Sequence, residues 1–117
     1  MKVQEFSLSA LEEYRPEKIV LKPVYESAGS KALLLHLLPG QEVPIHPHPN
    51  WEVTLLPRHG QACLVSEDGA ETVLSAGALY YGDIAPSFGI QNRTQKPFQM
   101  LILLVRVGPV RDGSIAA

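Results

Sequence analysis

Three side chains that commonly bind metal ions, those of His46, His48 and Glu52, lie within one short segment of this chain. Pro47 and Pro49 each push the preceding histidine out of the helical region into an extended backbone. In an extended chain alternate side chains lie on one face, about 6 to 7 Å apart. We therefore expect the two imidazoles to face the same way.

The residues after His48 can return a carboxylate to the same centre. Pro49 and Asn50 form a turn-prone pair ahead of Trp51, and a bend there would bring Glu52 back toward the histidines. Two imidazoles and a carboxylate suit iron(II), and the same ligands also accept nickel, copper, manganese, cobalt and zinc. The segment predicts a divalent transition metal, and ligand type alone does not choose the ion.

This segment resembles the first motif of the cupin superfamily, in which a glycine, two histidines, a glutamate and a second glycine follow at fixed spacings. The matching residues are Gly40, His46, His48 and Glu52. Only the last spacing departs, since seven residues rather than six separate Glu52 from Gly60. We expect a one-residue bulge or a longer turn after Arg58. The resemblance covers residues 30 to 107.

The second motif of that superfamily fits in length but not in content. Gly77 and Asn92 match it, and Asn92 has the place of a loop-closing residue. Asp83, Ala85 and Phe88 stand where the pattern has proline, glycine and a fourth metal-binding histidine. A rival register aligns Pro86 and puts Gln91 at the histidine position, but it loses both matches. The resemblance therefore implies three protein ligands plus water, with the amide of Gln91 as a weaker candidate ligand.

Length and charge limit the class of protein. The chain has 117 residues and a formal net charge of -2, so it fits one domain. We place its core at residues 18–107, with 108–117 as a loosely ordered tail. No positive field attracts nucleic acid or anionic lipid. No apolar run approaches the length that a bilayer requires, and the N-terminus does not resemble a secretory signal. We expect a cytoplasmic protein that binds neither nucleic acid nor membrane.

Most of the chain reads as short strands separated by Gly, Pro and Asn. The expected strands are 19–25, 31–38, 43–45, 52–56, 61–66, 71–74, 78–81, 89–92 and 98–107. Asp68 and Gly69 predict a tight hairpin turn. Ser9 and Glu12 form a possible capping box that opens a short N-terminal helix, which Pro16 would end. The predicted fold is all-β, and the resemblance implies a double-stranded β-helix (jelly-roll or cupin barrel) after that helix.

Several strands are apolar on both faces, notably at residues 33–35 and 101–104. A sheet with one solvated face should instead alternate. Something must therefore cover the outer faces. A second copy of the chain is the economical explanation, and we expect a homodimer.

Four further side chains are candidates for lining a pocket beside the metal: His36, Trp51, Phe88 and Gln91. His36 lies among leucines, where a hydrogen-bonded core histidine is the more common case. Phe88 would make the cavity drier beside the metal. Trp51 could hold a planar or apolar substrate. Cys63, the sole cysteine, reads as a buried hydrophobe, with a redox-sensitive or ligating thiolate as the alternative.

The resemblance to cupins implies two possible classes of function, and the residues named above are compatible with both. The first is a metal-dependent enzyme of the dioxygenase type that acts on a small organic molecule. The second is a non-catalytic cupin that binds a small molecule or senses a metal. No second acid or base is placed convincingly near the site, and Asp83 is the best remaining carboxylate. A purely structural domain fits least well, because converging histidines and a carboxylate are costly to bury unless they are paired or ligated.

Overall fold

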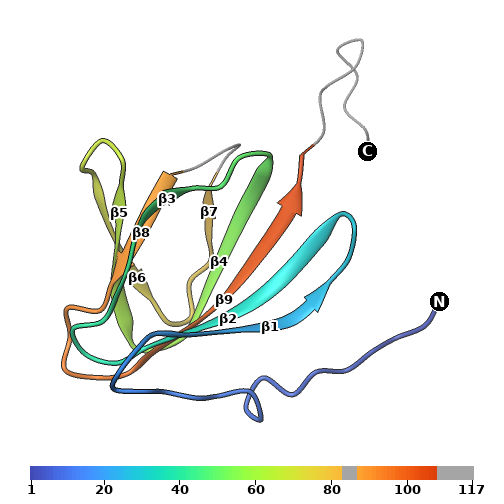
Figure 1. The fold of residues 1–117 in the computed structure, drawn as a ribbon, viewed down its shortest axis with the longest axis horizontal. Coiled ribbons are helices and arrows are strands. Elements are labelled where there is room, and N and C mark those ends of the chain that lie inside the picture. Colours follow the sequence, from blue (N-terminus) through green and yellow to red (C-terminus); the bar gives the residue numbers. More distant parts are fainter. Residues whose placement is uncertain (83–86, 108–117) are drawn as a thin grey trace.

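The computed structural model describes residues 1–82 and 87–107, and these residues form two facing β-sheets (Figure 1). One sheet has the order β1-β2-β9-β4-β7 and the other has the order β3-β8-β5-β6. The strands are β1 (Val20–Glu26), β2 (Ser30–Leu37), β3 (Glu42–Pro47), β4 (Trp51–His59), β5 (Gln61–Ser66), β6 (Glu71–Ser75), β7 (Tyr80–Gly82), β8 (Ser87–Gln91) and β9 (Phe98–Arg106). The predicted all-β jelly roll is confirmed, and every expected strand is present.

The core lies between the two sheets, where their inward-facing side chains meet. Its buried members are Leu35, Leu37, Val53, Leu55, Ala62, Leu74, Phe88, Ile90, Phe98, Met100, Ile102 and Leu104. Strand β4 shows the alternation clearly, because Val53 and Leu55 are buried while Thr54 and Leu56 are half-buried. Burial of such side chains contributes about 1.5 to 3 kcal/mol each. The apolar alternation therefore fixes which face of each strand turns inward.

Two glycine turns shape the ends of the strands. Gly69 has a φ of 89° and closes the β5–β6 hairpin that Asp68 and Gly69 predicted. Gly60 has a φ of 77°, and a Cβ there would lie 2.3 Å from the carbonyl oxygen of Pro97. The register of β4 against β9 shifts between Pro57 and His59. The predicted irregularity before Gly60 is thus a bulge within β4.

The predicted N-terminal helix is wrong. Residues 8–11 form only turns, in which Leu11 N–H donates to the Leu8 carbonyl and Glu12 N–H to the Ser9 carbonyl, both at 3.2 Å. The Ser7 hydroxyl, rather than that of Ser9, accepts from the Ala10 N–H. A segment this short cannot offset the cost of helix nucleation before Pro16 stops it.

The N-terminal segment instead runs alongside β1 and β2 (Figure 1). The Tyr14 ring packs edge-on against His36, with 5.2 Å between ring centroids. Leu34 and His36 alternate with the core residues Leu35 and Leu37, so they face outward, yet they are fully buried. Part of the outer apolar face is therefore covered by the chain itself.

Asn92 holds the loop after β8 to the end of β2, as its motif position predicted. Its Nδ2 donates to the carbonyls of Leu37 and Lys96, at 3.0 and 2.9 Å. Its Oδ1 accepts from the N–H and hydroxyl of Thr94, at 3.0 and 2.8 Å. The side chain is 1% exposed, so these bonds replace solvent completely.

Asp83, Ala85 and Pro86 lie outside the described residues, as does the predicted tail 108–117. Across the part of the chain that the structure describes, no helix is long and apolar enough to cross a membrane.

Candidate metal centre and adjoining cavity

His46 lies near the end of β3 on the face that turns toward the core. It pairs with Phe88 of β8, and Val43 pairs with Ile90, with a bulge between Val43 and His46. Phe88 and Ile90 both belong to the buried core. Because directly paired residues point to the same side of a sheet, His46 shares the face of these two side chains.

His48 follows β3 at a tight turn that returns the chain into β4. Asn50 has a φ of 67°, and Trp51 N–H donates to the His48 carbonyl at 3.4 Å. Asparagine tolerates this left-handed conformation better than most residues. The bend that Pro49 and Asn50 predicted is therefore present.

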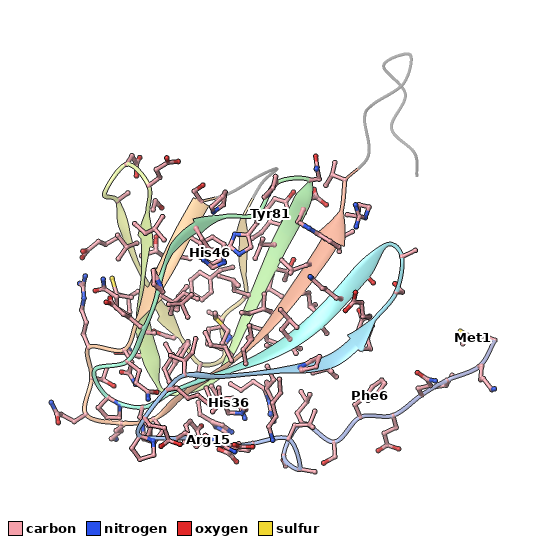
Figure 2. All side chains as sticks on the ribbon, in the orientation of Figure 1. Met1, Phe6, Arg15, His36, His46 and Tyr81 are labelled. Carbon is pink, nitrogen blue, oxygen red and sulfur yellow. The ribbon has the colours of Figure 1, made fainter. Side chains whose placement is uncertain are left out.

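The two imidazoles lie together, as the sequence predicted. The ring centroids of His46 and His48 are 4.4 Å apart. The His48 ring also stacks on Phe88, with 4.6 Å between centroids and 14° between planes. Figure 2 labels His46 beside the gap between the two sheets, far from His36 and Arg15.

One hydrogen bond orients His46. Its Nδ1 lies 3.0 Å from the carbonyl oxygen of Pro44. A carbonyl only accepts, so Nδ1 carries the proton and donates it. Nε2 is then the ring nitrogen that carries a lone pair, and a backbone carbonyl bound to the other nitrogen is typical of a metal-binding histidine.

Glu52 is not brought to the histidines. The pairing of β4 with β9 is regular from Trp51 to Pro57, so Glu52 alternates with the buried Val53 and faces the other way. Its partner on β9 is Val105, which is 44% exposed. The carboxylate of Glu52 lies on the outer face of the sheet.

The Glu52 carboxylate is hydrogen-bonded there by Tyr81. Tyr81 pairs with Thr54, on the face that carries Glu52, and its hydroxyl donates to Glu52 Oε1 at 2.5 Å. Within residues 1–82 and 87–107, no group of three or more His, Cys, Asp or Glu side chains is arranged to hold a metal ion. The structure therefore assembles a histidine pair and places the third predicted ligand elsewhere.

A cavity of about 470 Å³ lies between the sheets beside the histidine pair. Its lining comes from both sheets: Val53, Leu55, Leu64, Ser66, Thr72, Leu74, Leu79, Tyr80, Tyr81, Gly82, Ser87 and Phe88. Phe88 joins the two features, because it lines the cavity and stacks on His48. The size falls within the range of small-molecule sites, about 300 to 1,000 Å³.

The other predicted lining residues, Trp51 and Gln91, are not among the side chains that surround this cavity. Trp51 lies near two cations, with Lys31 Nζ 5.2 Å and Arg106 Cζ 4.7 Å from its ring centroid. Gln91 pairs with Cys63, and its Oε1 accepts from Arg93 Nε at 2.8 Å. Both therefore have structural partners of their own.

His36 is a core histidine and does not line the cavity. Its Nδ1 lies 3.3 Å from the Val20 carbonyl, and its Nε2 lies 3.1 Å from Gln99 Nε2. Arg58 Nη1 donates to Gln99 Oε1 at 2.8 Å. The amide of Gln99 must then donate to His36 Nε2, so the imidazole is neutral with its proton on Nδ1. Burial lowers the pKa of His36 below its usual 6.5.

Cys63 is 7% exposed and alternates with Leu64, which lines the cavity. The thiol therefore faces away from the cavity. Burial raises its pKa, which disfavours the reactive thiolate. This placement supports a small buried hydrophobe rather than a ligand of the histidine pair.

The sequence did not identify Tyr81 as the partner of Glu52, nor the hydroxyls of Ser66 and Thr72 as cavity groups. These residues come from four different strands. Only the pairing of those strands brings them together, and no local spacing signals it.

Comparison with solved structures identifies the architecture. The chain is similar to TT1209 of Thermus thermophilus, with 26% identity, a TM-score of 0.77, and coverage of 92% of this chain and 100% of that one. It is similar to a Klebsiella pneumoniae protein with a double-stranded β-helix domain, with 24% identity, a TM-score of 0.82, and coverage of 90% and 91%. It is also similar to an RmlC-like cupin protein of Desulfovibrio desulfuricans, with 24% identity, a TM-score of 0.72, and coverage of 90% and 96%. No protein-family model and no curated protein sequence matches the chain.

Proposed function

Since this chain has the double-stranded β-helix fold of the cupin superfamily, we propose that it binds a divalent transition metal at His46 and His48 and acts on a small organic molecule in the adjoining cavity. The observation that carries the proposal is the imidazole pair beside Phe88, with 4.4 Å between the two ring centroids. The Pro44 carbonyl, 3.0 Å from His46 Nδ1, supports it by leaving Nε2 as the metal-binding atom.

The donor set suits a first-row ion, and the two histidines are the side chains that would hold it. When bound, such an ion supplies Lewis-acid or oxygen-activating chemistry. Iron, nickel, manganese, zinc, cobalt and copper all accept imidazole. Glu52, the third ligand that the sequence predicts, could join only after leaving Tyr81 and turning through the plane of the sheet.

The cavity would hold the organic molecule next to the histidine pair. Phe88 would exclude water from the wall that the two sites share, since its ring stacks on His48 and the residue also lines the cavity. Val53 and Leu55 would contact the apolar part of the molecule. The reaction class we propose is dioxygenase-like, in which the chain positions its substrate and keeps the site dry.

A second candidate is a cupin that binds a small molecule or senses a metal without turnover. The placement of Glu52 favours it, because two protein ligands hold a metal less tightly than three and leave occupancy dependent on the surrounding metal concentration. Oxygen consumption by iron-loaded protein with thiols, diketones and phenols separates the candidates. Turnover supports the enzyme, whereas ligand-induced spectral shifts without product support the binder.

Elemental mass spectrometry of the reconstituted protein tests the metal site. We expect close to one metal per chain, and we expect its loss in the double variant His46→Ala, His48→Ala. The matched control is His59→Ala, which removes an exposed imidazole at the end of β4 and should leave the metal content unchanged. Equal metal in the double variant and the control would refute the site.

We further propose that the protein is a cytoplasmic homodimer, which binds neither nucleic acid nor membrane. Tyr14 and its neighbours cover only part of the outer sheet face, and Tyr25 and Val105 remain 40% and 44% exposed. A second copy would bury these side chains. Sedimentation at micromolar concentration should give twice the mass of the chain, and a monomer would exclude this assembly.

A further inference from the structure

The cavity has two chemically different walls. Val53 and Leu55 of β4 present only apolar groups to it, whereas Ser66 of β5 and Thr72 of β6 present hydroxyls. Leu64 pairs with Thr72, and Ser66 is two residues beyond Leu64 on the same face. The two hydroxyls therefore lie on one wall, opposite the apolar one.

These hydroxyls are available to a ligand. Neither the Ser66 hydroxyl nor the Thr72 hydroxyl makes a hydrogen bond with the part of the chain that the structure describes, whereas the oxygen of Tyr80 already accepts from the Ser75 N–H at 3.0 Å. A hydroxyl can both donate and accept. A ligand edge with either kind of polar group can thus be satisfied at this wall.

Charge is the feature that the wall lacks. No described residue that lines the cavity is Asp, Glu, Lys, Arg or His. An ionised ligand group packed against these described side chains would lose water without gaining an opposite charge from them, which is strongly unfavourable. Neutral hydrogen bonds to hydroxyls carry no such penalty.

We propose that the cavity is a binding site for an uncharged organic molecule with an apolar body and a hydrogen-bonding edge, such as a small alcohol, phenol or ketone. The apolar body lies against Val53 and Leu55, and the polar edge meets Ser66 and Thr72. Phe88 closes the end nearest the histidines. This inference rests on the proposed function, because the molecule is the one on which the bound metal would act.

Three probes of similar size test the ligand class: toluene, benzyl alcohol and benzoate. Each is titrated into the full-length chain in the presence of a chelator, so that the result is independent of the metal site. Methyl chemical shifts of Leu55 and Leu74 report binding inside the cavity. We expect benzyl alcohol to bind about threefold to tenfold more tightly than toluene, which lacks the hydrogen bond. Benzoate should bind at least about tenfold more weakly than benzyl alcohol.

Matched variants locate the polar edge. Thr72→Val removes a hydroxyl at nearly constant volume and should reduce the preference for benzyl alcohol over toluene, while toluene binding stays unchanged. Thr54→Val makes the same change on the outer face of β4 and should alter neither affinity.

Benzoate binding as tight as benzyl alcohol would overturn the inference, as would an unchanged preference in Thr72→Val or the absence of methyl shifts with all three probes. A protein that binds benzyl alcohol as expected but holds no metal would instead overturn the proposed function alone.

Discussion

Replacing Asn92 by alanine should destabilise the fold strongly and leave the histidine pair intact. The side chain bonds the Leu37 and Lys96 carbonyls and both polar groups of Thr94. Through its backbone, Asn92 also bonds Gly40 and Gln41, at 2.8 and 3.0 Å. Asn92 thus joins the loop between β8 and β9 to the end of β2 and the β2–β3 connection, at the end of the barrel away from His46.

The size of the effect follows from burial. Alanine at position 92 leaves the Leu37 carbonyl without its side-chain donor, and Leu37 is fully buried. A buried group left unsatisfied costs about 1 to 3 kcal/mol. The three remaining bonds are partly buried and contribute roughly 0.5 to 1 kcal/mol each after water replaces them. The expected loss is therefore about 4 kcal/mol, or a fall of roughly 15 °C in Tm for a domain of this size.

Urea unfolding followed by tryptophan fluorescence and circular dichroism measures the free energy of unfolding. Gln61→Ala is the matched control, since it removes an exposed amide with a side-chain bond of 3.2 Å to Ser75 and should change stability by less than about 0.5 kcal/mol. A loss below about 1 kcal/mol in Asn92→Ala would refute the reasoning. So would a normal stability accompanied by a lowered metal content.

Three further predictions test the site and the fold. Glu52→Gln should keep metal affinity within about threefold, because the carboxylate faces Tyr81; calorimetric titration with Ni²⁺ checks this, and a fall beyond about 100-fold would show Glu52 acting as a ligand. Gly60→Ala should lower the free energy of unfolding by about 2 to 3 kcal/mol, because its Cβ would meet the Pro97 carbonyl; unchanged urea unfolding would contradict that contact. The lowered pKa of His36 means that this residue binds a proton more readily in the unfolded chain than in the folded one. The contribution of neutral His36 to stability is therefore complete above about pH 6.5 and is lost as the pH falls through the folded pKa. The free energy of unfolding measured in urea should therefore fall between pH 7.5 and pH 5. An equally steep pH dependence in His36→Gln would assign the effect to other titratable groups.

Neighbouring residues were enough to predict the strands, the hairpin at Gly69 and the closeness of the His46 and His48 rings. Each depends on neighbouring residues: proline restricts the backbone before it, glycine allows positive φ, and alternating apolar side chains select extended chain. The role of Asn92 also followed from the sequence, through its place in a motif. Local physics and motif spacing were sufficient for these features.

The tertiary structure decided which way Glu52 faces. The spacing after His48 allowed the carboxylate to return to the histidines, but the regular pairing of β4 with β9 assigns Val53 to the core and Glu52 to the outer face. A strand alternates its side chains strictly, so one position of register decides between the two faces. Leu55 and Leu56 are both apolar, so the sequence alone does not choose between the two faces. The pairing of Val53 and Leu55 with core residues about 50 positions away in the chain makes that choice.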